Sequence, residues 1–573
     1  MEKRWKISEP LTEEEYKFKE QIVQHIHCPE IIAEILVKKG IINIERIKQF
    51  FEPSLQHTFD PFLFVDMDKA VRRIISAIET QQKITVYGDY DVDGATSTAL
   101  LYLGFKRIGA DIEYYIPNRM EEGYGLSLDG IQQIKERGTK LLISVDCGIN
   151  ADAEVETINS MDMDIIITDH HNPKDTLPNA FAIINAKVED CGYPYKDLAG
   201  VGVAYKLLMA VYTRMNKNTP SEIERFLDLV AVGTIADIVP LTGENRIFAS
   251  VGLAHLDKKR NIGLKALINI AGTSNKELNT TDIVFGLAPR INAAGRMGSA
   301  MRAVELLISK EEEESRGLAQ LIEGENNKRQ EIDQQTFREA CELIEQKYPD
   351  MDNTYCFVIS SENWHPGVIG IVASKLVERY YRPTIMISIK GGVGSGSGRS
   401  ISDFDLFSAL SELDDLLESF GGHKYAAGLS ILPEYLEEFE RRFQECTEKH
   451  IDHQQLIPPL SVDHKLELHH VNDKLISWLE KFAPYGPGNM RPVFYTDDVI
   501  VSSYPYTVGR NHLKLKIEKD GCVLDMIGFN LGQLKALLHK GDNINIAYSL
   551  EWNTWQNKTT IQGKIKDIHF VRS

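Results

Sequence analysis

Short apolar runs alternate with helical stretches through the first half of the chain. The runs begin at Lys83, Asp111, Lys140, Asp164 and Ala180 and read KITVYGD, DIEYYIP, KLLISVD, DIIITDHH and AFAIINA. Each run is too short for a typical helix, and helical periodicity lies between most of them, as in SLDGIQQIKERG. This alternation predicts a parallel sheet covered by helices on both faces, with ligands bound beyond the carboxyl ends of its strands.

In the second half of the chain, the pattern of apolar and charged residues changes three times. A highly charged stretch with spaced apolar positions follows the predicted sheet and indicates a long helical connector. After it come the apolar runs CFVIS and PTIMISI, which flank the helical VIGIVASKLVERY, and then a region of alternating apolar residues typical of antiparallel strands. The predicted segments are an N-terminal helical segment (1–80), a parallel-sheet α/β domain (81–308), a helical connector (309–348), a smaller α/β domain (349–455) and a C-terminal antiparallel β-barrel of the OB-fold type (456–573).

Composition narrows the class of protein. The chain has 573 residues, of which 43% are hydrophobic and 26% charged, as in a soluble protein of several domains. Its seven cysteines form no CxxC pair, and neither a secretory signal nor a membrane span is evident, so we expect reduced thiols and a cytoplasmic location. The net charge of −19 argues against a generic nucleic-acid binder. It leaves room for an enzyme that holds nucleic acid locally, because metal-binding carboxylates add negative formal charge.

A cluster of carboxylates follows the first predicted strand. In VYGDYDVDG, Asp89, Asp91 and Asp93 occupy alternate positions, where they would repel one another unless a cation neutralised them. A capping turn explains the same residues equally well. An EF-hand is excluded, because position twelve of a loop that starts at Asp89 is Leu100 instead of glutamate.

Further acidic and histidine residues follow later apolar runs. Asp146 lies in ISVDCGI, His170 and His171 lie in IIITDHHNP, and Asp237 lies in LVAVGTIADIVPL. Read singly, these residues suit helix termini or loop histidines. Read together, three of the sites end strands of one sheet, where their side chains can converge. Oxygen ligands with one or two imidazoles suit Mn²⁺ or Mg²⁺, and two such ions support phosphoryl displacement. The pattern therefore predicts a two-metal hydrolase.

The order of these motifs resembles the DHH phosphoesterase superfamily. Later segments resemble the RecJ family within it: APRINAAGRM, WHPGVIGIVASKL, GSGRS, GGHKYAAG and APYGPGN, in that order over nearly the whole chain. The resemblance implies DHH, DHHA1 and OB-fold domains and a 5′→3′ exonuclease that releases 5′-mononucleotides from single-stranded DNA in recombination and repair. It also implies two Mn²⁺ or Mg²⁺ ions and a monomer, with a single-strand-binding protein and a helicase as candidate partners.

The resemblance also implies roles for individual residues. The implied metal ligands are Asp89, Asp91, Asp93, Asp146, His170 and Asp237. Asp89 is a candidate substitute for the metal-binding histidine that related phosphodiesterases carry where this chain has Tyr87. His171 is expected to contact the scissile phosphate or to orient a ligand, as part of a catalytic set with the other ligands. The implied substrate contacts are Arg119 for the 5′-phosphate, Arg290, Asn292, Arg296 and His365 along the strand path, and Ser397, Arg399, Gly422 and His423 in a glycine-rich phosphate cradle of the second α/β domain.

The barrel is expected to grip the incoming strand. Lys514 and Lys516 fall on one polar face, and four aromatic residues are candidates for stacking on bases, although aromatic residues at strand spacing also suit a core: Tyr504, Tyr506, Trp552 and Trp555. Because the chain ends shortly after the barrel, we expect no additional C-terminal partner-binding domain.

Two other functions compete with this interpretation. One is a DHH phosphodiesterase that acts on short oligoribonucleotides or cyclic dinucleotides; the connector, the third domain and the WHPGVIG segment count against it. The other is a DNA-binding relative that has lost its metals, and the intact Asp91, Asp93, Asp146 and His170 count against that. A cysteine nucleophile is disfavoured, because no base and orienting group accompany Cys147.

Overall fold

The structure is a computed structural model that describes residues 3–118, 122–123, 125–556 and 558–571. The chain forms two compact units. One contains residues 48–329 and 482–490, and the other contains residues 1–47, 330–481 and 491–573. Among the described residues, no helix combines the length and the apolar character needed to cross a membrane.

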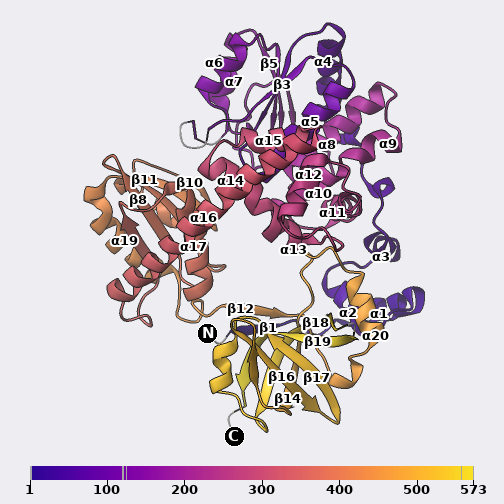
Figure 1. Ribbon diagram of the computed structural model, residues 1–573, viewed down its shortest axis with the longest axis vertical. Helices are drawn as coiled ribbons and strands as arrows, with labels where there is room; N and C mark the ends of the chain where they lie inside the picture. Colours follow the sequence, from indigo (N-terminus) through magenta and orange to yellow (C-terminus); the bar gives the residue numbers. More distant parts are fainter. Residues whose placement is uncertain (1–2, 119–121, 124, 557, 572–573) are drawn as a thin grey trace. The chain divides into compact units, whose positions relative to one another are not determined.

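The first unit is built on a five-stranded parallel sheet (Figure 1). In spatial order its strands are β3 (Ile112–Tyr115), β2 (Ile84–Gly88), β4 (Leu141–Val145), β5 (Asp164–Thr168) and β6 (Ala182–Ile184). They correspond to the five apolar runs of the sequence, so the predicted parallel sheet is confirmed. The chain leaves β2 for β3 on one side and then crosses to β4 on the other. The carboxyl ends of β2 and β4 are therefore the switch point at which such sheets bind ligands.

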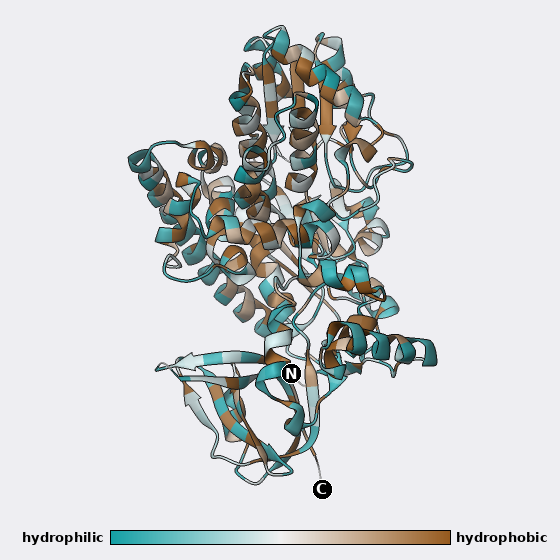
Figure 2. Ribbon diagram, turned by 90° about the vertical axis from the view of Figure 1, so that its right-hand side faces the viewer, coloured by the Kyte–Doolittle hydropathy of each residue, from teal (hydrophilic) through white to brown (hydrophobic). Residues whose placement is uncertain are grey.

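Helices cover both faces of this sheet. Val86, Ile143 and Ile166 lie side by side on neighbouring strands and pack into the larger core, whereas Leu142 and Ile167 face the smaller one. Hydrophobic residues gather along the strands and the helices packed around them (Figure 2). The larger core includes α4 (Met67–Glu79), α5 (Val92–Arg107), α8 (Gly200–Arg214), α10 (Leu227–Ala236), α11 (Gly243–Leu256), α12 (Ile262–Ile270), α14 (Ala288–Met297) and α15 (Met301–Ile308), and the smaller includes α6 (Leu128–Glu136) and α7 (Asp152–Ser160).

Two short helices, α9 (Pro220–Ile223) and α13 (Thr280–Asp282), complete this unit. The predicted helical connector is the single helix α16 (Glu312–Lys347), and the division between the two units falls within it. Its first half contributes Ala319 and Ile322 to the larger core, and its second half contributes Ala340 and Ile344 to a core of the other unit.

A nine-residue segment, 482–490, belongs to the first unit although residues of the second unit flank it on both sides. The buried side chain of Arg246 holds it. This guanidinium donates hydrogen bonds to the carbonyl oxygens of Phe482 (2.7 Å), Ala483 (2.9 Å) and Phe50 (3.0 Å). The backbone N–H of Leu241 adds a 2.7 Å bond to the carbonyl of Pro487. The APYGPGN motif of the sequence is thus an anchored segment of the first unit.

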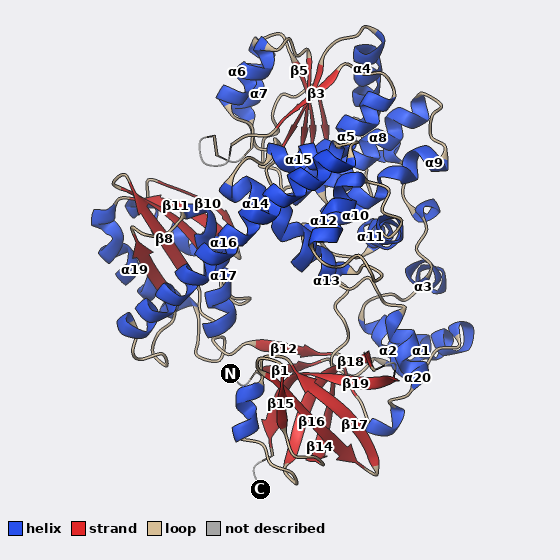
Figure 3. Cartoon of the chain, in the orientation of Figure 1, coloured by secondary structure: helices blue, strands red, loops and turns tan. Residues whose placement is uncertain are grey.

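The second unit contains a mixed sheet with the strand order β10–β11–β9–β8–β7 (Figure 3). Only β7 and β8 are parallel. Glycines of β9 allow close packing here, since a Cβ at Gly396 would lie 2.6 Å from Leu429 and one at Gly398 would lie 2.7 Å from Leu406. The elements are β7 (Phe357–Ser361), α17 (Pro366–Tyr380), β8 (Thr384–Lys390), β9 (Val393–Arg399), α18 (Leu406–Ser411), β10 (Ser419–His423), β11 (Ala426–Ile431) and α19 (Leu436–His450).

The C-terminal strands close into a barrel, because β14 pairs with both β18 and β16. The predicted alternation is confirmed: Leu513, Leu515 and Ile517 are buried, and so are the apolar residues of β18 at 544, 546, 548 and 550. The elements are β12 (Pro459–Val462), β13 (His464–Lys465), α20 (Asp473–Glu480), β14 (Phe494–Val501), β15 (Tyr506–Val508), β16 (His512–Lys519), β17 (Cys522–Gly528), β18 (Asn543–Trp555) and β19 (Lys558–Phe570).

The N-terminal segment departs from the prediction of helices alone. It contains α1 (Glu13–Ile26), α2 (Glu30–Lys38) and α3 (Ile44–Phe51), but begins with a strand, β1 (Arg4–Ile7). This strand pairs in parallel with β12, so Trp5 lies opposite Leu460. Four residues have no periodicity of their own, and their partner lies more than 450 residues away, so local pattern could not reveal the strand.

Candidate metal centre

The predicted ligands converge at the carboxyl edge of the parallel sheet. Asp89 directly follows β2, Asp146 follows β4, and His170 lies two residues after β5. Asp91 caps α5, and its Oδ1 accepts the backbone N–H of Gly94 at 3.0 Å. Asp237 ends α10. All six predicted ligands are thus brought to one place, together with His171.

Asp93 is held from the opposite side by the start of α8. Its Oδ2 accepts the backbone N–H of Gly200 at 2.6 Å, and its Oδ1 accepts that of Val201 at 2.8 Å. Gly200 also leaves room for the cluster, since a Cβ there would lie 2.8 Å from Asp146 Oδ1 and 2.9 Å from Asp93 Oδ2. The sequence analysis missed this residue, because nothing in DLAGVG identifies a helix start that faces the carboxylates.

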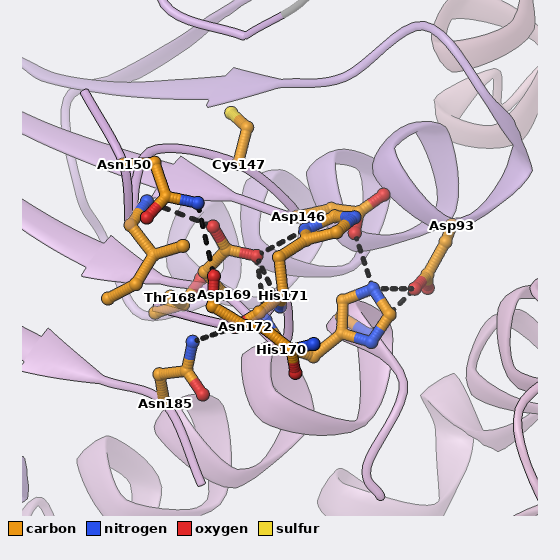
Figure 4. Close-up of polar contacts among 12 residues, drawn as sticks. Asp93, Asp146, Cys147, Asn150, Thr168, Asp169, His170, His171, Asn172 and Asn185 are labelled. Carbon is orange, nitrogen blue, oxygen red and sulfur yellow. Dashed lines mark hydrogen bonds and ion pairs between the residues drawn. The ribbon is translucent and has the colours of Figure 1, made fainter. Parts of the chain in front are cut away.

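His170 lies among three carboxylates, and Figure 4 shows two of them, Asp93 and Asp146, beside its ring. Its Nε2 is 3.1 Å from Asp146 Oδ1, 3.7 Å from Asp237 Oδ2 and 3.9 Å from Asp93 Oδ2. Neither ring nitrogen makes a hydrogen bond with the residues that the structure describes, and the same is true of Asp237 Oδ2. Burial, with the neighbouring His171, lowers the pKa of His170 to about 3, so its imidazole is neutral and offers a lone pair.

His171 is oriented by Asp169, the first residue of the TDHH motif after the threonine. The Nδ1 of His171 lies 2.7 Å from Asp169 Oδ1, which also accepts the backbone N–H of His170. Burial would lower the pKa of His171, but the hydrogen bond to Asp169 outweighs it and raises that pKa above its ordinary value. Nδ1 is therefore the nitrogen that Asp169 engages, and this contact fixes the orientation of the ring. Asp169 was absent from the predicted site residues, although its place in the motif was a usable signal.

The carboxylates cannot all be ionised without a countercharge. Burial and repulsion from Asp91 raise the pKa of Asp93 to about 7, and burial with repulsion from Asp93 raises that of Asp237 to about 9. Burial and the neighbouring carboxylates also raise the pKa of Asp146 well above its ordinary value. A divalent cation removes this penalty, because it offsets several negative charges at once.

The donor set fits divalent metal. Within this cluster of described residues, three groups have ligand atoms within 4.8 Å of one another: Asp89, Asp91 and Asp146; Asp93, His170 and Asp237; and Asp146, His170 and His171. Two of the groups share Asp146, so this carboxylate lies where it can serve two adjacent ions. Oxygen ligands with imidazole suit Mn²⁺ and Mg²⁺, and the unbonded nitrogens of His170 point to a missing partner.

Tyr87 takes no part in this cluster. It is fully buried against the smaller core on the other face of the sheet, and its hydroxyl accepts the backbone N–H of Ser127 at 3.1 Å. The neighbouring Cys147 is also buried, and burial raises the pKa of its thiol well above the ordinary value, which disfavours a thiolate nucleophile.

The predicted DNA contacts of the first unit lie in different settings. Arg119 lies outside the described residues. Asn292 and Arg296 are one turn apart on α14. This helix packs closely against the loop between β2 and α5 that carries Asp89 and Asp91, because Gly295 has no side chain; a Cβ there would lie 2.7 Å from the carbonyl oxygen of Tyr90. Arg290 is engaged within the unit, since its guanidinium forms an ion pair with Glu323 at 2.7 Å.

The predicted phosphate cradle of the second unit consists of strands and a hairpin. Ser397 and Arg399 lie on β9 instead of a loop, and the Arg399 guanidinium donates to Ser397 Oγ at 3.1 Å. Gly422 and His423 end β10, where His423 is opposite Ala426, which is itself opposite Arg399. The two basic residues therefore lie at one level of the sheet. By contrast, His365 caps α17 by accepting the N–H of Gly367 at 3.0 Å.

The barrel presents several of its aromatic side chains to solvent. Tyr504, Tyr506 and Trp555 are 79%, 50% and 71% exposed, so the alternative that they form the core does not hold for them. Trp552 is half-buried, and of the two predicted lysines Lys516 is exposed and lies 3.4 Å from Asp525.

Comparison with known proteins assigns the family. Family models match the DHH family N-terminal domain at residues 83–234, the DHHA1 domain at 352–449 and the RecJ OB domain at 462–567. The chain is 38% identical to the single-stranded-DNA-specific exonuclease RecJ of Bacillus subtilis (strain 168), with 98% of this chain and 70% of that protein covered. It is 37% identical to RecJ of Salmonella typhimurium, over 94% of this chain and 96% of that protein.

The fold agrees with that assignment. The crystal structure of RecJ from Thermus thermophilus in complex with Mn²⁺ superposes with a TM-score of 0.84 at 26% identity, with 100% of this chain and 80% of that chain covered. The chain belongs to the RecJ family of DHH proteins.

Proposed function

We propose that this chain is a metal-dependent 5′→3′ exonuclease that hydrolyses phosphodiester bonds in single-stranded DNA and releases 5′-mononucleotides during recombination and repair. The observation that carries the proposal is the convergence of Asp93, Asp146, Asp237 and His170 in a buried cluster, within a family whose named members are single-stranded-DNA-specific exonucleases. The polarity and the product follow the family resemblance.

The ions would be held by the six predicted ligands. Asp89, Asp91 and Asp146 supply one group of carboxylate oxygens, and Asp93 and Asp237 supply another together with an imidazole nitrogen of His170. Mn²⁺ or Mg²⁺ bound there would activate a water molecule and stabilise charge on the leaving oxygen. The backbone amides of Gly200 and Val201 fix the Asp93 carboxylate, so the protein holds this ligand in place before any ion binds.

His171 acts on the substrate side of the cluster. Asp169 fixes its ring through Nδ1 and favours the protonated form, so its Nε2–H can donate to a non-bridging oxygen of the scissile phosphate. A cationic donor there stabilises the negative charge of the transition state. We assign Asp169 the role of positioning His171.

The remaining contacts grip the strand without reading its sequence. Asn292 and Arg296 on α14, with Ser397, Arg399 and His423 in the second unit, are assigned to the phosphate backbone. The exposed aromatic rings of the barrel are assigned to stacking, which every base permits. Arg290 enters this set only when it exchanges Glu323 for a phosphate.

The working environment and partners are further parts of the proposal. Each of the seven cysteines is free, which suits a reducing cytoplasm. A single-strand-binding protein and a helicase are the partners proposed from the family, and the enzyme is proposed to act as a monomer.

The test is an assay with Mn²⁺ on 5′-labelled and 3′-labelled single strands, the matching duplex and short RNA. We expect the 5′ label to leave first as a mononucleotide, with the duplex and the RNA resistant. The Asp146→Ala variant should lose turnover while it keeps most of its affinity for DNA. A preference for RNA dinucleotides, activity in excess EDTA, or wild-type rates in Asp146→Ala would each contradict the proposal.

A further inference from the structure

A cavity of about 500 Å³ opens in the first unit at the end of α5 that is remote from the metal ligands. Asp91 and Asp93 lie at the start of this 16-residue helix, and Lys106 and Arg107 lie at its end, about 20 Å away at the helical rise per residue. Likewise, Asp237 follows the last residue of α10, whereas Asp228 and Leu229 in the first turn of that helix line the cavity. The cavity is therefore separate from the metal centre.

The lining of this cavity is strongly basic. Five cationic side chains contribute to it against one carboxylate, that of Asp228, in a chain whose net charge is −19. The cations come from four separate parts of the chain: Lys106, Arg107, Arg225, Arg260 and Lys310. Such a concentration of like charge is unfavourable unless an anion offsets it.

The protein offsets only part of this charge, since Arg260 acts on the nearby Asp228 carboxylate and Arg225 acts on that of Glu222. Arg107 forms an ion pair with Glu222, and Lys106 donates to the Tyr102 hydroxyl at 2.6 Å. Within the described ranges, Arg225, Arg260 and Lys310 form no ion pair. The Nε of Arg225 is buried and makes no hydrogen bond there. A buried N–H without an acceptor is destabilising, so an anion in the cavity would stabilise this group.

The cavity also has apolar and aromatic walls. Leu103, Phe226 and Leu229 line it beside the cations. An adjoining groove of about 440 Å³ shares Leu103, Lys106 and Lys310 with the cavity. It adds Tyr102 and Tyr114, whose ring centroids lie 5.3 Å apart, and the carboxylates of Glu305 and Glu314, which favour the base over the phosphates at this end. A ligand that spans both spaces would meet cations at one end and tyrosine rings at the other. Phosphate groups and a nucleobase match these two environments.

We propose that this cavity binds a nucleoside polyphosphate, with its phosphates among Arg225, Arg260 and Lys310 and its base in the adjoining groove beside Tyr102 and Tyr114. The volume is that of an ordinary small-ligand site. The binding requires neither the metal ions nor nuclease activity, so it is tested independently of the proposed function.

The experiment measures binding of ATP to the full chain by calorimetry in EDTA, which removes metal-mediated binding at the catalytic cluster. Wild type and Asp146→Asn should bind ATP alike. The double variant Arg225→Gln/Arg260→Gln should bind it roughly tenfold more weakly or worse, since each ionic contact contributes a few-fold. Inorganic triphosphate should compete with ATP, whereas adenosine alone should compete weakly.

A matched control changes two exposed cations elsewhere in the same unit. The double variant Arg72→Gln/Lys140→Gln removes the same charge and should bind ATP as wild type does. Equal melting temperatures of the two double variants would exclude misfolding as the cause. The proposal is overturned if wild type binds no ATP, if both double variants lose affinity equally, or if the cavity variant loses only its affinity for a single-stranded dT oligonucleotide, which would assign these cations to DNA.

Discussion

Replacing Gly200 by alanine should damage the metal centre without unfolding the protein. A Cβ at this position would lie 2.8 Å from Asp146 Oδ1 and 2.9 Å from Asp93 Oδ2, where ordinary contact begins at 3.4 Å. The carboxylates must therefore move by about 0.5–0.6 Å to restore ordinary contact. Catalytic groups tolerate roughly 0.5 Å, and a displacement of ~1 Å can cost about 100-fold in rate. We expect kcat to fall by about 10- to 100-fold, with weaker binding of Mn²⁺.

The same helix offers a control. A Cβ at Gly202 would come no closer than 3.2 Å to the end of the flexible Leu198 side chain. Alanine favours a helix by about 1 kcal/mol over glycine, so neither variant should lose stability through the backbone. The assay measures initial rates on a 5′-labelled single strand across a titration of Mn²⁺, with circular dichroism to compare folding. Wild-type rates and half-saturation in Gly200→Ala, or an equal loss in Gly202→Ala, would refute the reasoning.

Two further predictions concern stability. Lys206 and Glu244 form a fully buried ion pair at 2.6 Å. Lys206→Met leaves the carboxylate unpaired and should lower the free energy of unfolding of the first unit by about 3–5 kcal/mol in denaturant, and adding Glu244→Gln should restore part of the loss. An unchanged unfolding midpoint in Lys206→Met would contradict the prediction. The hydrogen bond from His464 lowers the pKa of Glu34 from 4.5 to about 2, so this carboxylate stabilises the second unit fully above pH 4.5 and progressively less toward pH 2. At pH 6 the free energy of unfolding of wild type should exceed that of Glu34→Gln by about 1–3 kcal/mol. This difference should shrink as the pH falls, and a difference that grew on acidification would contradict the prediction.

The sequence revealed the sheet and its ligands through one kind of signal. Apolar β-branched runs identified the strands, and residues that directly follow parallel strands must meet at one edge, which is where Asp89, Asp146 and His170 lie. The alternation of Leu513, Leu515 and Ile517 predicted the barrel for the same reason, because period two is imposed locally by the strand itself.

The rest depends on contacts between residues far apart in the chain. Gly200 matters only because α8 begins opposite Asp93, more than 100 residues earlier, and no local pattern encodes that approach. Similarly, Arg290 was expected along the DNA path, but its partner Glu323 is supplied by a later helix. Solvent exposure of Trp555 could not be predicted either, since strand periodicity does not tell which face of a barrel hairpin is covered.

The anchoring of residues 482–490 by Arg246 has a consequence for dissecting the protein. A fragment that ends at α16 lacks the nonapeptide, and the guanidinium of Arg246 then loses the carbonyl acceptors of Phe482 and Ala483 in a buried setting. A minimal nuclease made by simple truncation would therefore be less stable, and its loss of activity would have a cause unrelated to DNA binding. Such a fragment should be stabilised by the missing peptide, added in solution or joined through a short linker. The catalytic unit is assembled from two separate stretches of one chain.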